Sequence, residues 1–197
     1  LFNEQQEIGA ELTVIEMTGW MRDAWFDWTG LRWVNPSPNM RNLNQAALYP
    51  GIGAIEGTNV SVGRGTDAPF EQIGAPWIDG VDLAEHLNAR SLSGIRFYPV
   101  AFTPESSKYA DQQCGGIYMI VTNRDLLRPV RVGLEVAAAL YQLYGDIFEI
   151  DAAARLLGSR DTLNRIKANE DLSAIAQSWV ADEAAWRRLR APYLLYY

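Results

Sequence analysis

The sequence has few of the residues that bind metals or form disulfides. Its 197 residues include one cysteine, Cys114, and one histidine, His86. A single cysteine excludes an internal disulfide, and these two residues are too few to provide the nitrogen and sulfur ligands of a zinc site. Metal binding would need carboxylates alone, so we expect no metal site and no cofactor. We expect Cys114 to be a small buried side chain and His86 to be a surface or packing residue of a helix.

Basic residues and long apolar runs are also scarce. The 17 lysines and arginines stand against 24 aspartates and glutamates, which gives a formal net charge of −7. Without a basic stripe interleaved with aromatic residues, the chain is not expected to bind nucleic acid. The apolar run VGLEVAAALYQLY is interrupted by Glu135 and Gln142, so we expect no membrane span, and the opening residues do not have the pattern of a secretory leader.

The spacing of apolar residues predicts a mixed α+β fold with strands ahead of helices. Segments 94–102 and 115–123 are bounded by glycine and turn residues, and we expect them to be neighbouring strands of one sheet. Residues 129–145 begin with proline and end with glycine, an asymmetry typical of a helix. From residue 152 onward the spacing is helical. The sequence thus predicts a small sheet in the first two thirds and a helical C-terminal third.

The remaining segments have weaker signals. Their composition predicts a strand at 11–18, a loop at 21–40, a short helix at 43–51, a strand at 53–61 and a helix at 81–90. Pro50 and Gly51 should end the short helix, and Asp79 is a candidate N-cap for the last one. No internal repeat or clear linker divides the chain, which favours a single unit.

One polar segment, AIEGTNVSVGRGTDAPFE at residues 54–71, keeps neither the strand nor the helix period for long. Its glycines do not complete a dinucleotide-binding fingerprint, and GRGT lacks the lysine of a phosphate loop. Arg64, flanked by two glycines, is either a turn residue facing solvent or a guanidinium presented to a ligand. Glu56, Asp67 and Glu71 are either solvated loop charges or members of a polar cleft that binds hydroxyls or transfers protons.

Aromatic residues are concentrated near the N-terminus, where four of the seven tryptophans lie between residues 20 and 33. They either fill a core or stack on sugar rings from a loop. The adjoining segment WVNPSPNM, residues 33–40, holds asparagines on a proline-stiffened loop, which suits the recognition of hydroxyl groups.

Four segments in this order resemble the NamZ-type exo-β-N-acetylmuramidases, a bacterial glycoside hydrolase family: WVNPSPNM, YPGIGAIEGTNVSVGRGTDAPFEQIGAPWI, FTPESSKYADQQCGGIYMIVTNRD and the closing YLLYY. The resemblance covers the whole chain but only the C-terminal half of that family. It implies that residues 1–197 are the C-terminal domain, that a Rossmann-like N-terminal domain is its partner, and that the active site lies between the two. It also implies an extracytoplasmic enzyme that releases β-1,4-linked N-acetylmuramic acid from the non-reducing ends of peptidoglycan fragments.

The resemblance gives the polar segment a chemical role. Glycoside hydrolysis normally needs two carboxyl groups, so Glu56 and Glu71 become the candidate catalytic residues. Arg64 becomes the candidate partner of the lactyl carboxylate of muramic acid, because a planar guanidinium can hold a carboxylate through two hydrogen bonds. Where relatives often have an acidic residue, this chain has Val62. The candidate substrate-binding residues are Asn35, Asn39, Asn59, Ser61, Arg64, Trp33, Trp77, Lys108 and Tyr109.

Three interpretations stay open at this point. In the first, Glu56 and Glu71 perform the chemistry. In the second, catalysis belongs to the N-terminal domain, and this chain is a substrate-binding and domain-closing module that provides specificity for the anionic sugar. In the third, the polar segment is a buried structural unit with no ligand, in which Arg64 pairs with Asp67 or Glu71 and is inaccessible to solvent.

Overall fold

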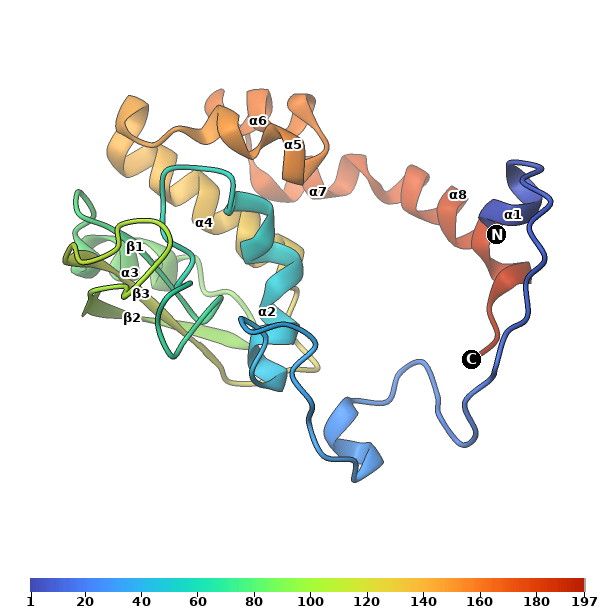
Figure 1. Ribbon diagram of the computed structural model, residues 1–197. Coiled ribbons are helices and arrows are strands. Elements are labelled where there is room, and N and C mark those ends of the chain that lie inside the picture. The colour runs from blue at the N-terminus through green and yellow to red at the C-terminus, as the bar shows by residue number, and fades with distance from the viewer. Residues whose placement is uncertain (197) are drawn as a thin grey trace. The chain divides into compact units, whose positions relative to one another are not determined.

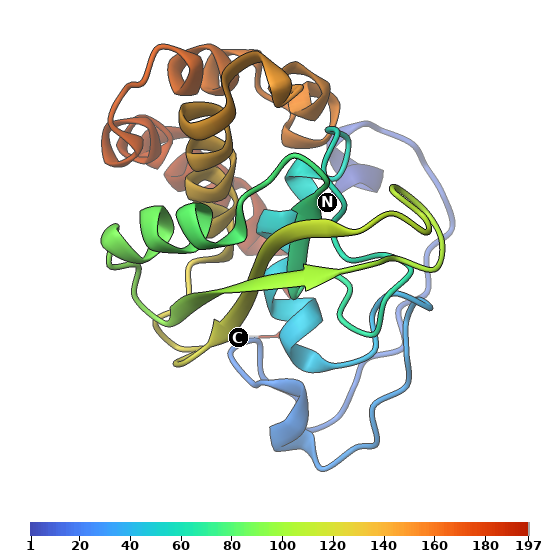
Figure 2. The same cartoon turned by 90° about the vertical axis from the view of Figure 1, so that its left-hand side faces the viewer.

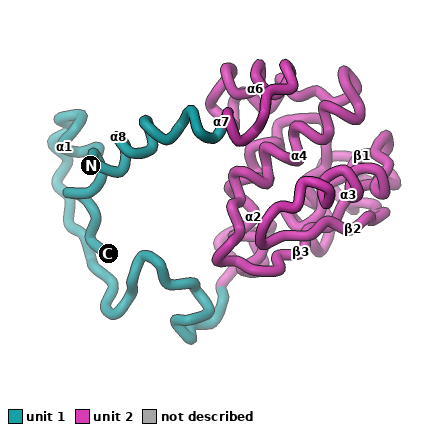
Figure 3. Tube along the Cα trace, turned by 180° about the vertical axis from the view of Figure 1, so that it is seen from behind, with its two compact units in different colours: residues 1–33, 176–197 teal, residues 34–175 magenta. Residues whose placement is uncertain are grey.

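The computed structural model describes residues 1–196, which divide into two compact units. Unit 1 comprises residues 1–33 and the C-terminal segment from Ala176, and unit 2 comprises residues 34–175 (Figure 3). Figure 1 shows the order of helices and strands along the chain. No helix within residues 1–196 is long and apolar enough to cross a membrane.

Unit 2 contains a three-stranded antiparallel sheet with the strand order β1-β3-β2. The strands are β1 (Gln72–Ala75), β2 (Ile95–Phe102) and β3 (Cys114–Val121). In the central strand, Tyr118 is paired with Gln72 on one side and with Tyr98 on the other. Figure 2 shows the strands with the helices of the unit beside them. The sheet thereby brings three polar side chains from different strands next to one another.

Three helices complete the core of unit 2. They are α2 (Leu43–Ile52), α3 (Gly80–Ala89) and α4 (Pro129–Tyr144). α3 packs against β2 and β3, and α4 packs against α2 and α3. The side chains at their centre are buried and apolar: Ile73 and Ile117 from the sheet, Leu83 and Leu87 from α3, and Val136 and Leu140 from α4. Their burial is the main source of the unit's stability.

The strongest sequence predictions are confirmed. The segments 94–102 and 115–123 correspond to the paired strands β2 and β3, and 129–145 corresponds to α4. Asp79 caps α3, because its carboxylate accepts hydrogen bonds from the backbone N–H groups of Val81 at 2.8 Å and Asp82 at 3.2 Å. Each of these elements combines an apolar periodicity with a clear start or stop residue.

The helical C-terminal third is also confirmed. It consists of short elements: η3 (Gly145–Ile147), η4 (Ile150–Ala153), α5 (Ala154–Leu157), α6 (Arg160–Lys167), α7 (Leu172–Ser178), α8 (Val180–Arg190) and η5 (Ala191–Tyr193). Two further short elements lie in unit 1: α1 (Phe2–Gln5) and η1 (Phe26–Thr29). The predicted loop at 21–40 is confirmed apart from η1.

The predicted strand at 53–61 is wrong. The chain continues from α2 into a 3₁₀ turn, η2 (Gly53–Ile55), and then into turns. At Gly57 the backbone packs closely against Ala152 of a later 3₁₀ element, since a Cβ there would lie 2.8 Å from the carbonyl oxygen of Ala152. Only Ser61 joins the sheet, through an isolated bridge to Gly74. The strand β1, which follows the polar segment, was not predicted.

Two other predictions need correction. The run at 11–18 forms no strand, and its apolar side chains are exposed, with Leu12 at 69% and Ile15 at 88%. A strand needs a partner, and within residues 1–196 the only sheet lies in unit 2. Pro50 does not end its helix, because α2 extends through it to Ile52.

Candidate functional site

The polar segment begins where α2 and η2 end. Glu56 directly follows η2, and Gly63 and Gly65 both have a positive φ, near 80°. A Cβ on Gly65 would lie 2.2 Å from the carbonyl oxygen of Ser106, so glycine is required for this close approach. The chain between Glu56 and the sheet is therefore folded tightly against the segment that follows β2.

Glu56 and Arg64 form a two-point ion pair. Arg64 Nε donates to Oε1 of Glu56, and Arg64 Nη2 donates to Oε2 at 3.2 Å. The two side chains are 27% and 30% exposed, so the pair remains accessible to solvent. The guanidinium also lies over the ring of Phe70, 5.1 Å from its centroid, in a cation–π contact. Arg64 is thus held by two independent contacts, of which only one is with another charged group.

Lys108 anchors the backbone beside this pair. Its ammonium donates to the carbonyl oxygen of Glu56 at 3.2 Å and to that of Thr58. Burial lowers the pKa of the Lys108 ammonium, and the negative charges of Glu56 and Glu149 oppose that shift. A second cation is therefore fixed close to the carboxylate of Glu56 by the backbone it binds.

The segment that carries Lys108 has an unusual backbone. Ser107, Tyr109 and Asp111 all have positive φ values, near 60–70°, although none is glycine. Tyr109 is held in place by its hydroxyl, which donates to the carbonyl oxygen of Asn59 at 2.7 Å and accepts from the Trp77 indole N–H at 3.4 Å. Such backbone strain is concentrated at functional sites in proteins, where surrounding contacts maintain it.

These residues surround a small polar cavity of about 60 Å³, which we call the cation cavity. Its lining residues are Glu56, Val60, Ser61, Val62, Arg64, Ser107 and Lys108. Two cations face one carboxylate in it, in a protein whose net charge is −7. The cavity has room for a small polar group such as a carboxylate.

A larger polar cleft of about 330 Å³ borders Gly65, the residue that follows Arg64. It is lined by Arg41, Gly65, Thr66, Asp67, Thr103, Glu105 and Ser106. Asp67 pairs there with Arg41 at 2.8 Å. The adjacent residues Arg64 and Gly65 thus line two different hollows, and the second one includes Asp67, which the sequence had placed among the possible members of a polar cleft.

Glu71 occupies a different environment from Glu56. Glu71 is buried, with 6% of its surface exposed. Its Oε2 accepts a hydrogen bond from the hydroxyl of Tyr118 at 2.7 Å. Among residues 1–196, its other carboxylate oxygen has no hydrogen-bond partner. Burial, this hydrogen bond and the negative charge of Glu71 raise the pKa of Tyr118 to about 12. The third interpretation paired Arg64 with Asp67 or Glu71 and made Arg64 inaccessible to solvent. Both parts are wrong, because Arg64 pairs with Glu56 and its side chain is 30% exposed.

The other predicted substrate-binding residues are distributed unevenly. The Asn59 amide is held by the backbone: Nδ2 donates to Ile147 O at 2.7 Å, and Oδ1 accepts from Glu149 N at 2.9 Å. Ser61 is buried, and its hydroxyl accepts from Gly63 N at 3.2 Å. Among these residues, the cation cavity brings together only Ser61, Arg64 and Lys108.

The aromatic and asparagine candidates lie elsewhere. Trp77 packs edge-on against Tyr144, with 5.1 Å between ring centroids. Trp33 belongs to unit 1, where it packs edge-on against Phe26 at 5.2 Å. Asn35 is exposed and Asn39 is partly buried, both in the loop that precedes α2.

The predictions for the single cysteine and the single histidine are confirmed. Cys114 is fully buried, which raises the pKa of its thiol. His86 lies on the outer part of α3, where Nε2 is 3.1 Å from Oε1 of Gln142 on α4. Within residues 1–196, no group of three or more histidine, cysteine, aspartate or glutamate side chains is arranged to hold a metal ion.

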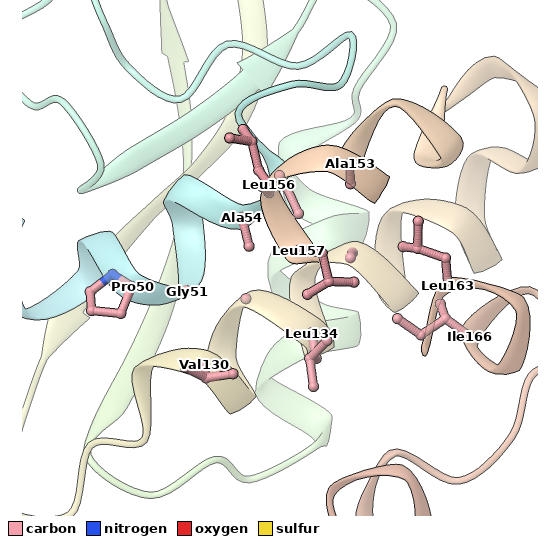
Figure 4. A pocket seen from close by; sticks show the side chains of 13 residues that line it. Pro50, Gly51, Ala54, Val130, Leu134, Ala153, Leu156, Leu157, Leu163 and Ile166 are labelled. Atoms are coloured by element: carbon pink, nitrogen blue, oxygen red, sulfur yellow. The ribbon is translucent and has the colours of Figure 1, made fainter. Parts of the chain in front are cut away.

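An apolar cavity of about 190 Å³ lies behind the polar segment, between α2, α4, α5 and α6 (Figure 4). Ala54, Leu134, Leu156 and Ile166 are among its lining side chains. It contains no group able to transfer a proton or bind a charge, so it is not a candidate for chemistry. Ala54 and Ile55, which directly precede Glu56 in the chain, line this cavity. The cavity therefore borders the segment that positions the carboxylate of Glu56.

Two protein-family models match the chain. The model described as "Exo-beta-N-acetylmuramidase NamZ, C-terminal" matches residues 47–196, and the one described as "Exo-beta-N-acetylmuramidase NamZ, N-terminal" matches residues 1–44. The polar segment and all residues of the cation cavity, Lys108 included, lie within the first match, whereas Arg41 of the larger cleft lies within the second.

Individual relatives agree with these matches. The peptidoglycan beta-N-acetylmuramidase NamZ of Bacillus subtilis (strain 168) is 39% identical over 199 residues, which cover 100% of this chain and 48% of the relative. A crystal structure of a DUF1343 family protein from Bacteroides fragilis NCTC 9343 has a TM-score of 0.83 and 25% identity, covering 100% of this chain and 54% of that one. A second such structure from the same organism has a TM-score of 0.61 and 28% identity, covering 82% and 43%. The chain thus spans about half the length of the curated relative it matches.

Proposed function

The chain belongs to the NamZ exo-β-N-acetylmuramidase family, and we propose that it is part of a glycoside hydrolase that releases N-acetylmuramic acid from the non-reducing ends of peptidoglycan fragments. The observation that carries this proposal is the cation cavity. It has the size of a carboxylate and carries two cations in an acidic protein. Muramic acid differs from the neighbouring N-acetylglucosamine of the glycan by a lactyl group that ends in a carboxylate. A fixed local cation is what an acidic protein needs to select that sugar.

In this proposal the lactyl carboxylate enters the cation cavity and the sugar ring stays outside it. Arg64 binds the carboxylate through two hydrogen bonds, and the charge of Lys108 adds to the local positive potential.

Glu56 is the catalytic candidate that the geometry favours. Its carboxylate is partly exposed beside the proposed carboxylate site, so it can reach a glycosidic oxygen or a water molecule. Glu71 is buried under Tyr118, and we assign it to holding the β1–β3 pair that carries the polar segment.

A second candidate function is supported by the partners of these two carboxylates. As half of an ion pair, Glu56 accepts hydrogen bonds and donates none, and Glu71 is buried. This arrangement suits a module that binds the anionic sugar while an N-terminal domain provides the acid and the base. In either function, residues 47–196, which match the C-terminal family model, act as the C-terminal domain of a longer enzyme whose cleft lies between two domains.

The rate of hydrolysis of a chromogenic β-N-acetylmuraminide distinguishes the two functions. It is measured for the longer protein that carries this chain, for its Glu56→Gln variant and for the 197-residue chain alone. A catalytic Glu56 predicts a loss of kcat of at least a hundredfold with little change in KM, whereas a binding Glu56 predicts a change mainly in KM. Glu183→Gln, which neutralises an exposed carboxylate paired with Arg187, is the matched control. Full kcat in Glu56→Gln would remove Glu56 from the chemistry.

We also propose that the enzyme works outside the cytoplasm, where peptidoglycan is found. The support for this location is the substrate that the family implies. Cell fractionation followed by detection of the longer protein tests it, and recovery in the cytoplasmic fraction alone would contradict it.

A further inference from the structure

Arg64, the proposed receptor for the substrate carboxylate, already holds a carboxylate of its own. Its Nε and Nη2 groups, which form the side edge of the guanidinium, are bonded to the two oxygens of Glu56. We propose that the substrate carboxylate replaces Glu56 on this edge of Arg64, and that the exchange releases Glu56 for the reaction. This inference rests on the proposed function, and it adds a specificity step that the proposed function does not contain.

The ion pair is suited to exchange because it is partly exposed. With side chains 27% and 30% exposed, water competes for both partners and weakens their attraction. Charge also favours exchange over coexistence. Both carboxylates would need the same edge of Arg64, and their two negative charges would repel each other side by side in the cavity.

The groups around the pair are arranged so that one side chain can leave while the other stays. The contact of Arg64 with the Phe70 ring does not depend on Glu56, so it keeps the guanidinium in place after Glu56 has moved. The ammonium of Lys108 binds the backbone carbonyl of Glu56 rather than its carboxylate. The backbone of Glu56 therefore remains anchored while its side chain changes rotamer.

Exchange makes recognition and chemistry depend on the same charge. A sugar with a carboxylate occupies Arg64 and frees Glu56. N-acetylglucosamine has no carboxylate, so it leaves Glu56 bound and unavailable. The specificity for an anionic sugar would then appear in kcat as well as in binding, because a neutral sugar that enters the site cannot release the reactive group.

Binding of free N-acetylmuramic acid tests this competition. Its affinity is measured by isothermal titration calorimetry for the protein, for Glu56→Gln and for Asp67→Asn, with N-acetylglucosamine as the neutral probe. Asp67→Asn is the matched control. Asp67 lies eleven residues after Glu56 in the same polar segment, and its carboxylate is paired with a different arginine, Arg41. Removing a competitor held by a partly exposed ion pair should tighten binding of the anionic sugar roughly three- to tenfold in Glu56→Gln.

The expected pattern is selective in two ways. Asp67→Asn should change the affinity for N-acetylmuramic acid by less than about twofold, and neither variant should tighten the binding of N-acetylglucosamine. Weaker or unchanged binding of the anionic sugar by Glu56→Gln would overturn the proposal. Equal tightening in both variants would also overturn it, because it would reflect net charge rather than competition for Arg64.

A crystal structure with N-acetylmuramic acid provides the direct geometric test. The sugar carboxylate should lie within hydrogen-bond distance of Nε and Nη2 of Arg64, with Glu56 displaced. A complex in which Glu56 keeps both bonds would overturn the exchange. Neither experiment needs turnover, so an enzyme that shows exchange but no Glu56-dependent hydrolysis would disprove the catalytic role alone.

Discussion

Gly51 and Gly133 contact each other through their backbones where α2 crosses α4. A Cβ on Gly133 would lie 2.3 Å from the carbonyl oxygen of Gly51, and a Cβ on Gly51 would lie 1.9 Å from that of Pro129. Because these neighbours are backbone atoms, they cannot move aside as a flexible side chain would. This crossing fixes the C-terminal end of α2, from which η2 leads directly to Glu56.

We expect Gly133→Ala to destabilise the fold by about 2 kcal/mol or more, because the added methyl group must push the two helices apart. Urea-induced unfolding measures this change in the free energy of unfolding. Gly53→Ala is the control, since its Cβ would meet only the exposed side chain of Tyr49, at 3.2 Å. That variant should stay within about 1 kcal/mol of the original protein, and equal losses in both would contradict the backbone argument.

Arg64→Lys should reduce the selectivity for the anionic sugar. Lysine keeps the positive charge but cannot form the two parallel hydrogen bonds of a guanidinium, whose loss costs about 1.5–3 kcal/mol. We therefore expect kcat/KM for a β-N-acetylmuraminide to fall roughly 10- to 100-fold, with little change for the matching glucosaminide. Arg187→Lys, in an exposed pair within α8, is the control and should leave both values unchanged. A uniform loss on both substrates would argue against a role in recognising the carboxylate.

The parts of the fold that the sequence predicted are those whose signals are local. Asp79 caps α3 because the hydrogen bonds that it makes reach only two and three residues ahead. Pro129 and Gly145 mark the two ends of α4 for a similar reason. Pro50 misled the prediction because packing of α2 on α4 outweighs the local cost of a proline in a helix.

The site is less predictable because it depends on contacts between distant residues. Lys108 meets the carbonyl oxygen of Glu56 across 52 residues, and Tyr118 meets Glu71 across 47. The polar segment itself could be recognised from its composition. Which of its carboxylates would pair with Arg64 could not, since Glu56, Asp67 and Glu71 all lie within eight residues of it and the backbone turns decide among them.

The burial of Tyr118, together with its hydrogen bond to Glu71, raises the pKa of its hydroxyl and should make stability depend on pH in the alkaline range. The pKa of Tyr118 is raised from 10.0 to about 12 in the folded chain, so between these values the unfolded chain loses a proton that the folded chain keeps. This contribution to stability is therefore complete below pH 10 and is lost as the pH rises toward 12. Tyr118→Phe should flatten this part of the profile, measured as the free energy of unfolding at several alkaline pH values. Tyr98→Phe on the neighbouring strand β2 should not, and an unchanged slope in Tyr118→Phe would contradict the assignment.

Asn59 was predicted to bind sugar, but both ends of its amide are hydrogen-bonded to the backbone of the segment after α4. We therefore expect mutation of Asn59 to lower the stability of the fold rather than the affinity for the sugar. Asn59→Ala removes one bond to Ile147 O and one to Glu149 N, at a cost of about 1–3 kcal/mol in the free energy of unfolding. Because Tyr109 binds the carbonyl oxygen of Asn59 rather than its side chain, that contact should survive the mutation. The binding of N-acetylmuramic acid should then change by less than about threefold at a temperature where the variant is folded. A large loss of binding in a stable Asn59→Ala protein would instead restore the amide to the substrate site, and would mean that it exchanges its backbone bonds for sugar hydroxyls.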